Sequence, residues 1–340
     1  MDEVLISADS HVSEDPELWV KCLPPNLRDQ APVFPPRQVG GHFQAHEGGW
    51  DPSARIQEME VDGVTAEVLY PSLTMDLFGL SDAVLQEACF RVYNDWIIDY
   101  CSVAPDRLTG LAAISTFDID HSVRELARTR EAGLRGAVVW QAPPPELAFT
   151  TDHYERLWAA AQEMDMPISM HILTGHRYPF PRPRTAAGRT AVHAFREAVN
   201  LKLLDASNAI SDLIGSGVLE RYPRAKFVLV ENEISWLPFY LNQYDKYWSR
   251  GNLTSTMTMT PSEYFERQFF ATFFNDPPVR WLLGEWGARN SMWSNDYPHP
   301  NSTWPHSRQV IERDLGHLPG DTRARLVRDN VADLYKLPIR

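Results

Sequence analysis

The sequence predicts an α/β fold, a distorted (β/α)8 TIM barrel, from three observations. Eight short apolar runs alternate with longer stretches of helical periodicity along the 340 residues. Several of these runs are apolar without alternation, as expected for parallel strands that are buried on both faces. No Gly-x-Gly-x-x-Gly or Walker A sequence appears, which counts against the main rival, a doubly wound sheet with a phosphate-binding loop.

The apolar runs are the expected barrel strands, and the helical stretches between and after them are the expected outer layer. The predicted strands cover residues 4–8, 66–70, 110–114, 136–140, 167–171, 227–231, 269–273 and 291–296. The predicted helices cover residues 81–103, 120–132, 152–164, 190–214, 236–247, 304–314 and 321–334.

The whole chain, residues 1–340, is expected to form one barrel domain with loop insertions after strands one and five. Residues 21–53 are rich in Pro, Gly and His and have weak periodicity, so we expect an insertion or lid there. Residues 176–184 are Pro-rich and cationic. Each stretch could contact substrate or could be a surface loop with no part in binding.

Composition excludes several classes of function. The chain is 44% hydrophobic with a net charge of −13, and no Lys/Arg cluster occurs, so nucleic acid is not an expected partner. No run of about 18 apolar residues exists, which argues against a membrane span. The N-terminus lacks a basic region followed by an apolar core, so we expect no signal peptide and a cytoplasmic protein. The three cysteines have no metal-like spacing.

Polar residues stand at the ends of four predicted strands, where a barrel concentrates its chemistry. Asp9 and His11 end the first, and their spacing of two puts both side chains on one face of a strand. The later candidates are His171 after strand five, Glu231 after strand six, and Asp296 with His299 at and beyond strand eight.

An Asp/His/His/Asp set suits Zn²⁺ or another divalent ion, with a position left open for water or substrate. Each residue also has a structural alternative. His171 could be a buried histidine with a backbone partner, Asp296 a turn-capping residue before Tyr-Pro, and Glu231 a partner of an arginine.

A second group of candidates would line the pocket rather than hold the ion. These residues follow strands two, four and five: Tyr70, Trp140, Gln141 and Arg177. Arg177 could hold an anionic substrate, or it could belong to a solvated loop.

Several motifs together resemble the amidohydrolase superfamily. They are the Asp-x-His of strand one, the lone His of MPISMHI, and SNDYPHPNSTWP. The resemblance is narrower to the amidohydrolase-related branch that includes aminocarboxymuconate-semialdehyde decarboxylase. VLVENEISWLPFYL and the C-terminal NVADLYKL are also similar to that branch, so the likeness spans most of the chain.

The resemblance implies one divalent metal ion held by Asp9, His11, His171 and Asp296. It also implies that Asp296 binds the metal-bound water and shuttles protons. Zn²⁺ is the first expectation and Mn²⁺ the second, because Asp-x-His in place of His-x-His makes the site more anionic. Glu231 departs from the pattern, since many members have a His near this position. It could be a fifth ligand, a residue that orients the ligands, or a general base.

Three functions follow. The first is a metal-dependent hydrolase that acts on a small, anionic carbonyl compound such as an amide, lactone or imide. The alternative is a metal-dependent non-oxidative decarboxylase of a small aromatic or unsaturated carboxylic acid. The third is a barrel that has lost its activity. The expected partner is a small molecule, and the resemblance is compatible with a homodimer.

Overall fold

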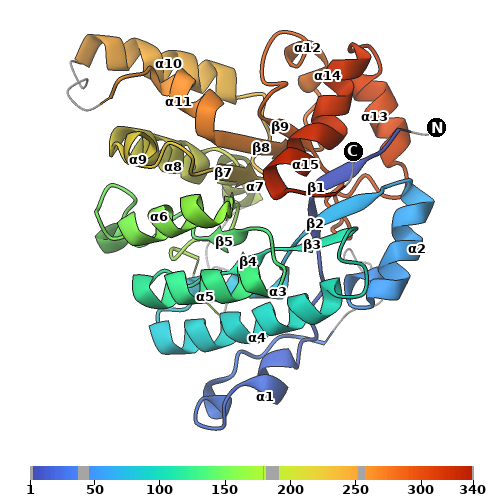
Figure 1. Cartoon of the computed structure of the whole chain (residues 1–340), viewed down its shortest axis with the longest axis vertical. Coiled ribbons are helices and arrows are strands. Elements are labelled where there is room, and N and C mark those ends of the chain that lie inside the picture. Colours follow the sequence, from blue (N-terminus) through green and yellow to red (C-terminus); the bar gives the residue numbers. More distant parts are fainter. Residues whose placement is uncertain (1–2, 37–45, 179, 181–190, 252–256, 339–340) are drawn as a thin grey trace.

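The computed structural model describes residues 3–36, 46–178, 180, 191–251 and 257–338. A ring of strands lies at the centre and helices surround it, with the two chain termini on the same side of the molecule (Figure 1). The strands are β1 (Ile6–His11), β2 (Ala66–Tyr70), β3 (Leu108–Gly110), β4 (Ala112–Ala113), β5 (Ala137–Val139), β6 (Ile168–His171), β7 (Phe227–Val230), β8 (Phe269–Phe273) and β9 (Ser291–Trp293).

All paired strands are parallel, and they form two arcs in the orders β1-β2-β3 and β4-β5-β6-β7-β8-β9. Leu111 joins the arcs, because its N–H donates to Leu69 O at 3.2 Å and the next residue pairs with the following strand. At the other junction, Asp296 N donates to Asp9 O at 3.0 Å and His11 N donates to Tyr297 O. These bonds close the barrel, so the predicted (β/α)8 fold is confirmed.

The helices form the outer layer, and several begin with the side-chain caps that the sequence provides. Asp51, Asp82 and Asp118 accept hydrogen bonds from the first turns of the second, fourth and fifth helices. The helices are α1 (Leu18–Cys22), α2 (Pro52–Asp62), α3 (Leu73–Asp76), α4 (Ala83–Cys101), α5 (Ile119–Glu131), α6 (Glu155–Met164), α7 (Ala191–Leu201), α8 (Leu204–Gly215), α9 (Val218–Arg221), α10 (Leu237–Gly251), α11 (Pro261–Gln268), α12 (Val279–Leu282), α13 (Ser307–Leu315), α14 (Gly320–Ala324) and α15 (Asn330–Tyr335).

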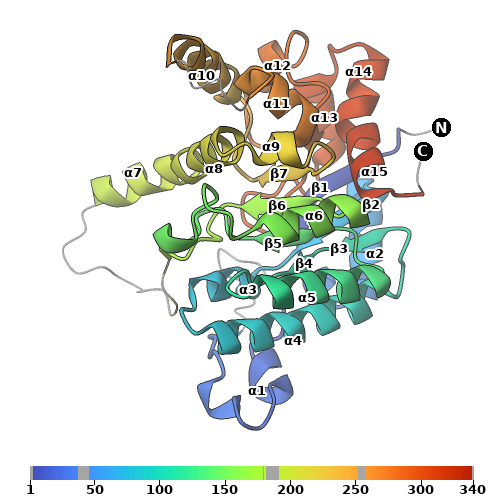
Figure 2. The same cartoon turned by 60° about the vertical axis from the view of Figure 1, so that its left-hand side comes forward.

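The first strand runs over Ile6–His11 rather than 4–8, and the helix predicted over 321–334 is divided into α14 and α15 by a π-helical turn at Arg325–Asp329. Three further differences have a clear physical reason. The third strand is split into β3 and β4, because it pairs with β2 before Leu111 and with β5 after it. The eighth ends at Trp293 rather than at residue 296, since Asp296 has a left-handed φ of 54° that a strand cannot accommodate. The helix predicted over 190–214 is broken between α7 and α8, and α7 projects from the body (Figure 2).

The predicted insertion at 21–53 contains the end of α1 and two short 3-10 turns, η1 (Arg28–Gln30) and η2 (Glu47–Gly49). Residues 37–45 lie outside the described residues, as do 179 and 181–184 of the second predicted insertion. The single-domain boundaries and the lid therefore stay predictions.

The buried side chain of Asn295 links the segments that close the barrel. Its side-chain amide accepts and donates five hydrogen bonds, from Ser7 Oγ (3.0 Å), Ser10 Oγ (2.8 Å) and Tyr297 N (3.1 Å) and to Asp62 Oδ2 (3.3 Å) and Glu67 Oε1 (3.2 Å). The first strand, α2, β2 and the turn after β9 thus meet at one side chain. Because every polar atom of this amide is satisfied, its burial is stabilising rather than costly.

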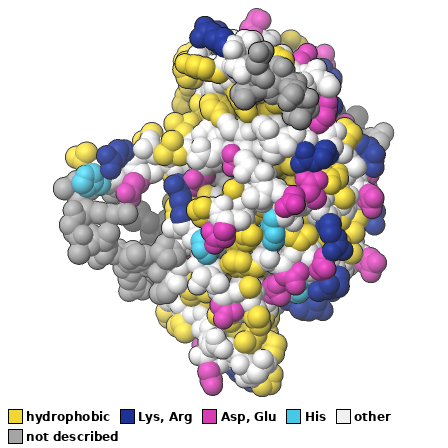
Figure 3. Space-filling model, turned by 90° about the vertical axis from the view of Figure 1, so that its left-hand side faces the viewer, with side chains coloured by type: hydrophobic (Ala, Val, Ile, Leu, Met, Phe, Trp, Pro, Cys, Tyr) yellow, Lys and Arg dark blue, Asp and Glu magenta, His cyan; other side chains and the backbone are white. Residues whose placement is uncertain are grey.

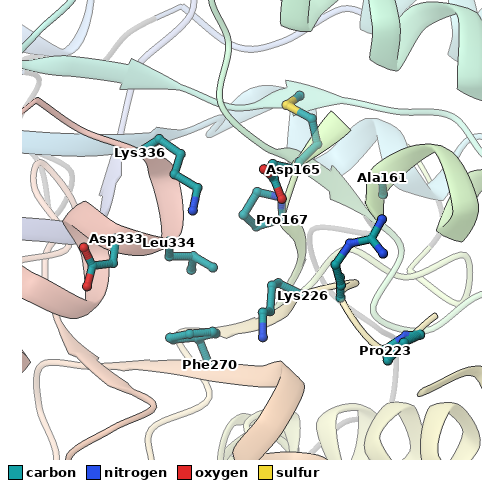
Figure 4. Close-up of a pocket in the computed structure, with 11 residues that line it drawn as sticks. Ala161, Asp165, Pro167, Pro223, Lys226, Phe270, Asp333, Leu334 and Lys336 are labelled. Carbon is teal, nitrogen blue, oxygen red and sulfur yellow. The ribbon is translucent and has the colours of Figure 1, made fainter. Parts of the chain in front are cut away.

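The N-terminal ends of the strands border a cavity of about 390 Å³. Figure 4 shows Asp333, Leu334 and Lys336 on one side of it, and Asp165, Pro167 and Lys226 on the other. In Figure 3, acidic and basic side chains are interspersed over the visible face. In the described part of the chain, no helix has the length and apolar character needed to cross a membrane.

Candidate active site

Six predicted residues converge at the C-terminal ends of the strands. Asp9 and His11 belong to β1, His171 ends β6, and Glu231, Asp296 and His299 follow β7 and β9. The His11 and His171 rings and the Asp9 carboxylate are fully buried. The first strand carries a register shift between Ser7 and Ser10, next to Asp9. A bulge of this kind re-aims side chains near active sites.

The two buried imidazoles have defined tautomers. Nδ1 of His11 lies 2.8 Å from Pro71 O, and Nδ1 of His171 lies 2.8 Å from Ile172 O. A carbonyl oxygen only accepts, so each Nδ1 carries the proton and each Nε2 presents a lone pair. These Nε2 atoms are 3.3 Å apart. Two facing lone pairs cannot form a hydrogen bond, but both can bind one cation.

The carboxylate oxygens that face these nitrogens form no hydrogen bonds within the described residues. Both oxygens of Asp9 and Oδ1 of Asp296 are buried without one, and the ion-pair contact of Asp296 Oδ1 is with His299 Nδ1 at 3.0 Å. Asp9 Oδ1 lies 3.4 Å from His11 Nε2 and 3.8 Å from His171 Nε2, and Asp296 Oδ1 lies 3.6 Å from His11 Nε2. Ligand bonds of about 2.1 Å in a tetrahedral site put the ligand atoms about 3.4 Å apart. These residues therefore fit a divalent metal ion.

Glu231 lies at the edge of this group. Its Oε2 atom is 3.7 Å from His171 Nε2, which is close enough for Glu231 to join the ligand set. The residue has a left-handed φ of 60°, and its N–H donates to Thr272 Oγ1 at 2.9 Å. The strand thus ends in a turn that points the carboxylate toward the barrel axis.

His299 covers the group from the mouth of the barrel. Its ring stacks on His11 with centroids 3.8 Å apart, and its Nδ1 lies 3.0 Å from Asp296 Oδ1. Its Nε2 lies 3.2 Å from Ser72 Oγ. The loop that carries Ser72 is fixed in turn by the buried carboxylate of Glu14, which accepts hydrogen bonds from three consecutive backbone N–H groups.

Burial shifts the pKa values of these groups toward their neutral forms when no cation is bound. Burial lowers the pKa of His171 to about 3 and that of His11 well below its usual value. Burial, reinforced by the neighbouring Asp296, raises the pKa of Glu231 to about 8. Burial and the Asp9 charge raise the pKa of Asp296 well above its usual value. Such shifts cluster at functional sites.

Sequence reasoning missed Lys202 and Glu233. Lys202 lies between α7 and α8, and its Nζ donates to Glu231 O at 2.8 Å and to Glu233 Oε1 at 3.3 Å. The sequence offers no signal for this contact, because Lys202 falls inside the stretch predicted as one continuous helix. Glu233 lies two positions after the candidate Glu231, and its left-handed φ of 56° turns it back toward the site.

The predicted pocket-lining residues are held by other contacts. The Tyr70 hydroxyl bonds Ser169 and Tyr335, although its ring lies beside both buried imidazoles. The remaining three contacts are Trp140 Nε1 to Phe78 O at 2.9 Å, Gln141 Nε2 to Asn232 Oδ1 at 2.7 Å, and Arg177 Nη2 to Asp205 Oδ2 at 2.8 Å. Their role toward substrate stays a prediction.

A parallel barrel whose strand ends gather buried imidazoles and carboxylates defines a metal-dependent enzyme on a TIM barrel. The profile of the Amidohydrolase family matches residues 9–337, nearly the whole chain. The chain belongs to the amidohydrolase family, and the resemblance seen in its motifs is confirmed. It is an enzyme of hydrolase or decarboxylase type.

The chain is similar to three further proteins. Gamma-resorcylate decarboxylase from Rhodococcus jostii (strain RHA1) is 26% identical over 281 residues, covering 73% of this chain and 76% of that protein. An amidohydrolase from Mycobacterium avium subsp. paratuberculosis K-10 has a TM-score of 0.81 at 15% identity, covering 98% and 100%. A dihydroxybenzoic acid decarboxylase from Polaromonas sp. JS666, solved with bound manganese and an inhibitor, has a TM-score of 0.73 at 18% identity, covering 100% and 98%.

Proposed function

We propose that this enzyme is a metal-dependent, non-oxidative decarboxylase of a small aromatic carboxylic acid. The observation that carries the metal site is the set of buried Asp9 and Asp296 oxygens that form no hydrogen bond and face two imidazole lone pairs. The decarboxylase relatives support the reaction, since the similarity extends over about three-quarters of their length. They favour decarboxylation over the hydrolysis that the sequence analysis placed first.

Asp9, His11, His171 and Asp296 would hold the ion. A bound divalent cation would supply Lewis-acid polarisation of the substrate carboxylate and of an adjacent ring oxygen. Asp296, in its protonated form, would give its proton to the ring carbon that bears the carboxylate, which forms a new C–H bond. The C–CO₂ bond then breaks, its electron pair returns to the ring, and CO₂ leaves. The Asp296 carboxylate regains a proton from solvent.

The remaining residues of the site orient these groups. His299 would fix the Asp296 carboxylate through Nδ1, at the observed 3.0 Å. Glu231 would orient His171 or add a ligand to the ion, because its carboxylate reaches His171 Nε2 at 3.7 Å. Tyr70, Trp140 and Gln141 would shape the walls of the pocket.

We infer that the ion is Zn²⁺ or Mn²⁺, both of which accept mixed imidazole and carboxylate ligands. The bound manganese of the related Polaromonas decarboxylase supports Mn²⁺ as a candidate. A small-molecule substrate, a cytoplasmic location and a homodimer complete the proposal.

The test is CO₂ release from metal-reconstituted protein, with hydroxybenzoic acids as the substrate panel and D₂O as solvent. The expected result is one CO₂ per arene formed, with one deuterium at the vacated ring position. The metal-free protein is the control and should release none. Consumption of water by an amide, lactone or imide without CO₂ release would replace this proposal with hydrolysis.

A further inference from the structure

The cavity at the N-terminal ends of the strands is separate from the candidate active site. It is lined by residues that precede β6 and β7, by the start of β8 and by the end of α15. In a parallel barrel the chemistry gathers at the opposite, C-terminal ends of the strands. The volume of the cavity, about 390 Å³, lies within the range of small-molecule sites. It can therefore hold a ligand that does not touch the metal ligands.

Three cationic side chains line this cavity, although the protein as a whole is acidic. They are Arg224, Lys226 and Lys336. Two carboxylates, those of Asp165 and Asp333, also line it, but in the described part of the chain neither forms an ion pair with these cations. Figure 4 shows the Lys336 ammonium extended toward the space between the two sides, with the Asp333 carboxylate turned away from it. The positive charges at the cavity are thus not neutralised by its own acids.

Lys226 is the most constrained of these cations. Its side chain is partly buried, and its Nζ donates to the backbone carbonyl of Arg267 at 2.6 Å. A carbonyl carries no net charge, and the other two N–H groups have no hydrogen-bond acceptor within the described ranges. Burial lowers the pKa of Lys226, and the charges of Arg267 and Lys336 lower it further. A bound anion would offset both effects.

An apolar surface lies beside the cations. Phe270, Leu334 and Met166 line the same cavity, and the Phe270 ring is only partly covered by the protein. Figure 4 shows this ring between Leu334 and Lys226. A ligand pocket commonly combines an apolar lining with a few polar groups that fix orientation. The surface here suits a molecule with an anionic group at one end and an apolar body at the other.

We propose that this cavity is a second binding site, in which Lys226 and Lys336 hold the phosphate or carboxylate of a small molecule with an apolar body. Phe270 and Leu334 would contact the apolar body. The inference does not depend on the proposed decarboxylation, because it concerns the opposite end of the barrel.

The test is a calorimetric titration with four probes. Phenyl phosphate and phenylacetate each join one of the two anionic groups to a phenyl ring. Inorganic phosphate lacks the apolar body, and 2-phenylethanol lacks the charge. Each probe is titrated into metal-loaded and metal-free wild type and into Lys226→Met, Lys336→Met and Lys246→Met. Lys246 is an exposed lysine of α10 outside the cavity, so Lys246→Met is the matched control.

We expect phenyl phosphate or phenylacetate to bind the wild type at least about tenfold more tightly than both inorganic phosphate and 2-phenylethanol. Lys226→Met and Lys336→Met should each weaken this binding about tenfold, the scale of one charge-assisted hydrogen bond. Lys246→Met and removal of the metal should leave it unchanged. The tighter of the two phenyl anions identifies the anionic group.

A wild type without this preference overturns the inference. So does binding that both cavity variants retain, and binding that disappears with the metal would place the probe at the metal site instead. Melting temperatures check that each variant is folded. Lys336 is exposed, so Lys336→Met alone decides the outcome if Lys226→Met does not fold. Absence of CO₂ release would count against the proposed reaction and would leave this result unaffected.

Discussion

The two ends of the barrel use the same unusual backbone conformation for different purposes. At the N-terminal end, Asp165 and Lys336 have φ values of 52° and 54°, and each terminates a helix beside the lower cavity. At the C-terminal end, Glu231, Glu233 and Asp296 have φ values of 60°, 56° and 54°, and each directs a carboxylate into the candidate site.

The difference lies in what the side chain does after the turn. Asp165 and Lys336 are exposed, so a glycine could replace either with little loss. The carboxylates of Glu231 and Asp296 lie close to imidazoles and to one another. Glycine at either position would relieve the backbone strain but would remove the carboxylate that the site needs. At the C-terminal end of the barrel, a non-glycine residue in the left-handed conformation is therefore a sign of function. At the N-terminal end, the same conformation serves only to end a helix.

The largest expected effect is that of Asp296→Asn. It removes the proton donor but keeps a ligand oxygen, so turnover should fall about 10²–10⁴-fold while metal content stays largely intact. Steady-state rates and elemental analysis check this. Asp333→Asn, at the lower cavity, is the matched control and should stay within about twofold of wild type. Activity of Asp296→Asn above about a tenth of wild type would contradict the proton-donor role.

The next effect is the loss of the ion in His171→Ala. The variant lacks one of the two facing Nε2 ligands, so we expect affinity for Zn²⁺ or Mn²⁺ to fall at least about tenfold. Elemental analysis of purified protein, followed by a metal titration, measures this. His317→Ala, an exposed histidine, should bind as much metal as wild type. Equal metal content in both variants would mean that His171 is structural.

A smaller effect is the pH dependence of the metal-free protein. The folded-state pKa of Glu231 is raised to about 8, so its contribution to stability is complete below its unfolded value and is lost as pH rises through about 8. His171 acts oppositely, but its lowered pKa affects stability only below pH 6.5. The melting temperature of metal-free protein should therefore fall between pH 6.5 and 8.5.

Two controls isolate this effect. Glu231→Gln should flatten the pH profile, and bound metal should flatten it in the wild type because the cation replaces the proton. A metal-free wild-type protein whose melting temperature is constant or rises over this window would contradict the assignment.

The smallest expected effect is a gain in stability at the opposite end. Asp165→Gly places glycine at a left-handed helix terminus and should raise the free energy of unfolding by about 0.5–1 kcal/mol, with activity unchanged. Urea denaturation measures the gain. Asp296→Gly relieves a similar φ but should abolish turnover. Equal activity in the two variants would remove the distinction between the two ends.

The sequence predicted the barrel and the convergence of six site residues because both depend on local signals. An apolar run marks a strand, and a polar residue at its end marks the mouth of the barrel. The contacts of Arg177 and Lys202 could not be predicted in this way. Arg177 is paired by Asp205, 28 positions later and in a different element, and Lys202 reaches the site only because the helix breaks beside it.

Left-handed residues escaped prediction for a related reason. The strand containing residues 291–296 was expected to run through Asp296, since no glycine marks a turn there. The hydrogen bonds of Asn295 with β1 and β2 impose that turn, and they involve residues 288 and 228 positions away. Conformations fixed by such distant partners have no local signature.

The closure of the barrel by Asn295 has a consequence for how the protein is made. The proposed ligands lie far apart along the chain, from Asp9 to Asp296, and Asn295, which links the segments that carry them, lies in the turn after the last strand. On the ribosome, the complete ion-binding set cannot exist until Asp296 has been synthesised. Nascent chains stalled before residue 290 should therefore not form the complete ion site.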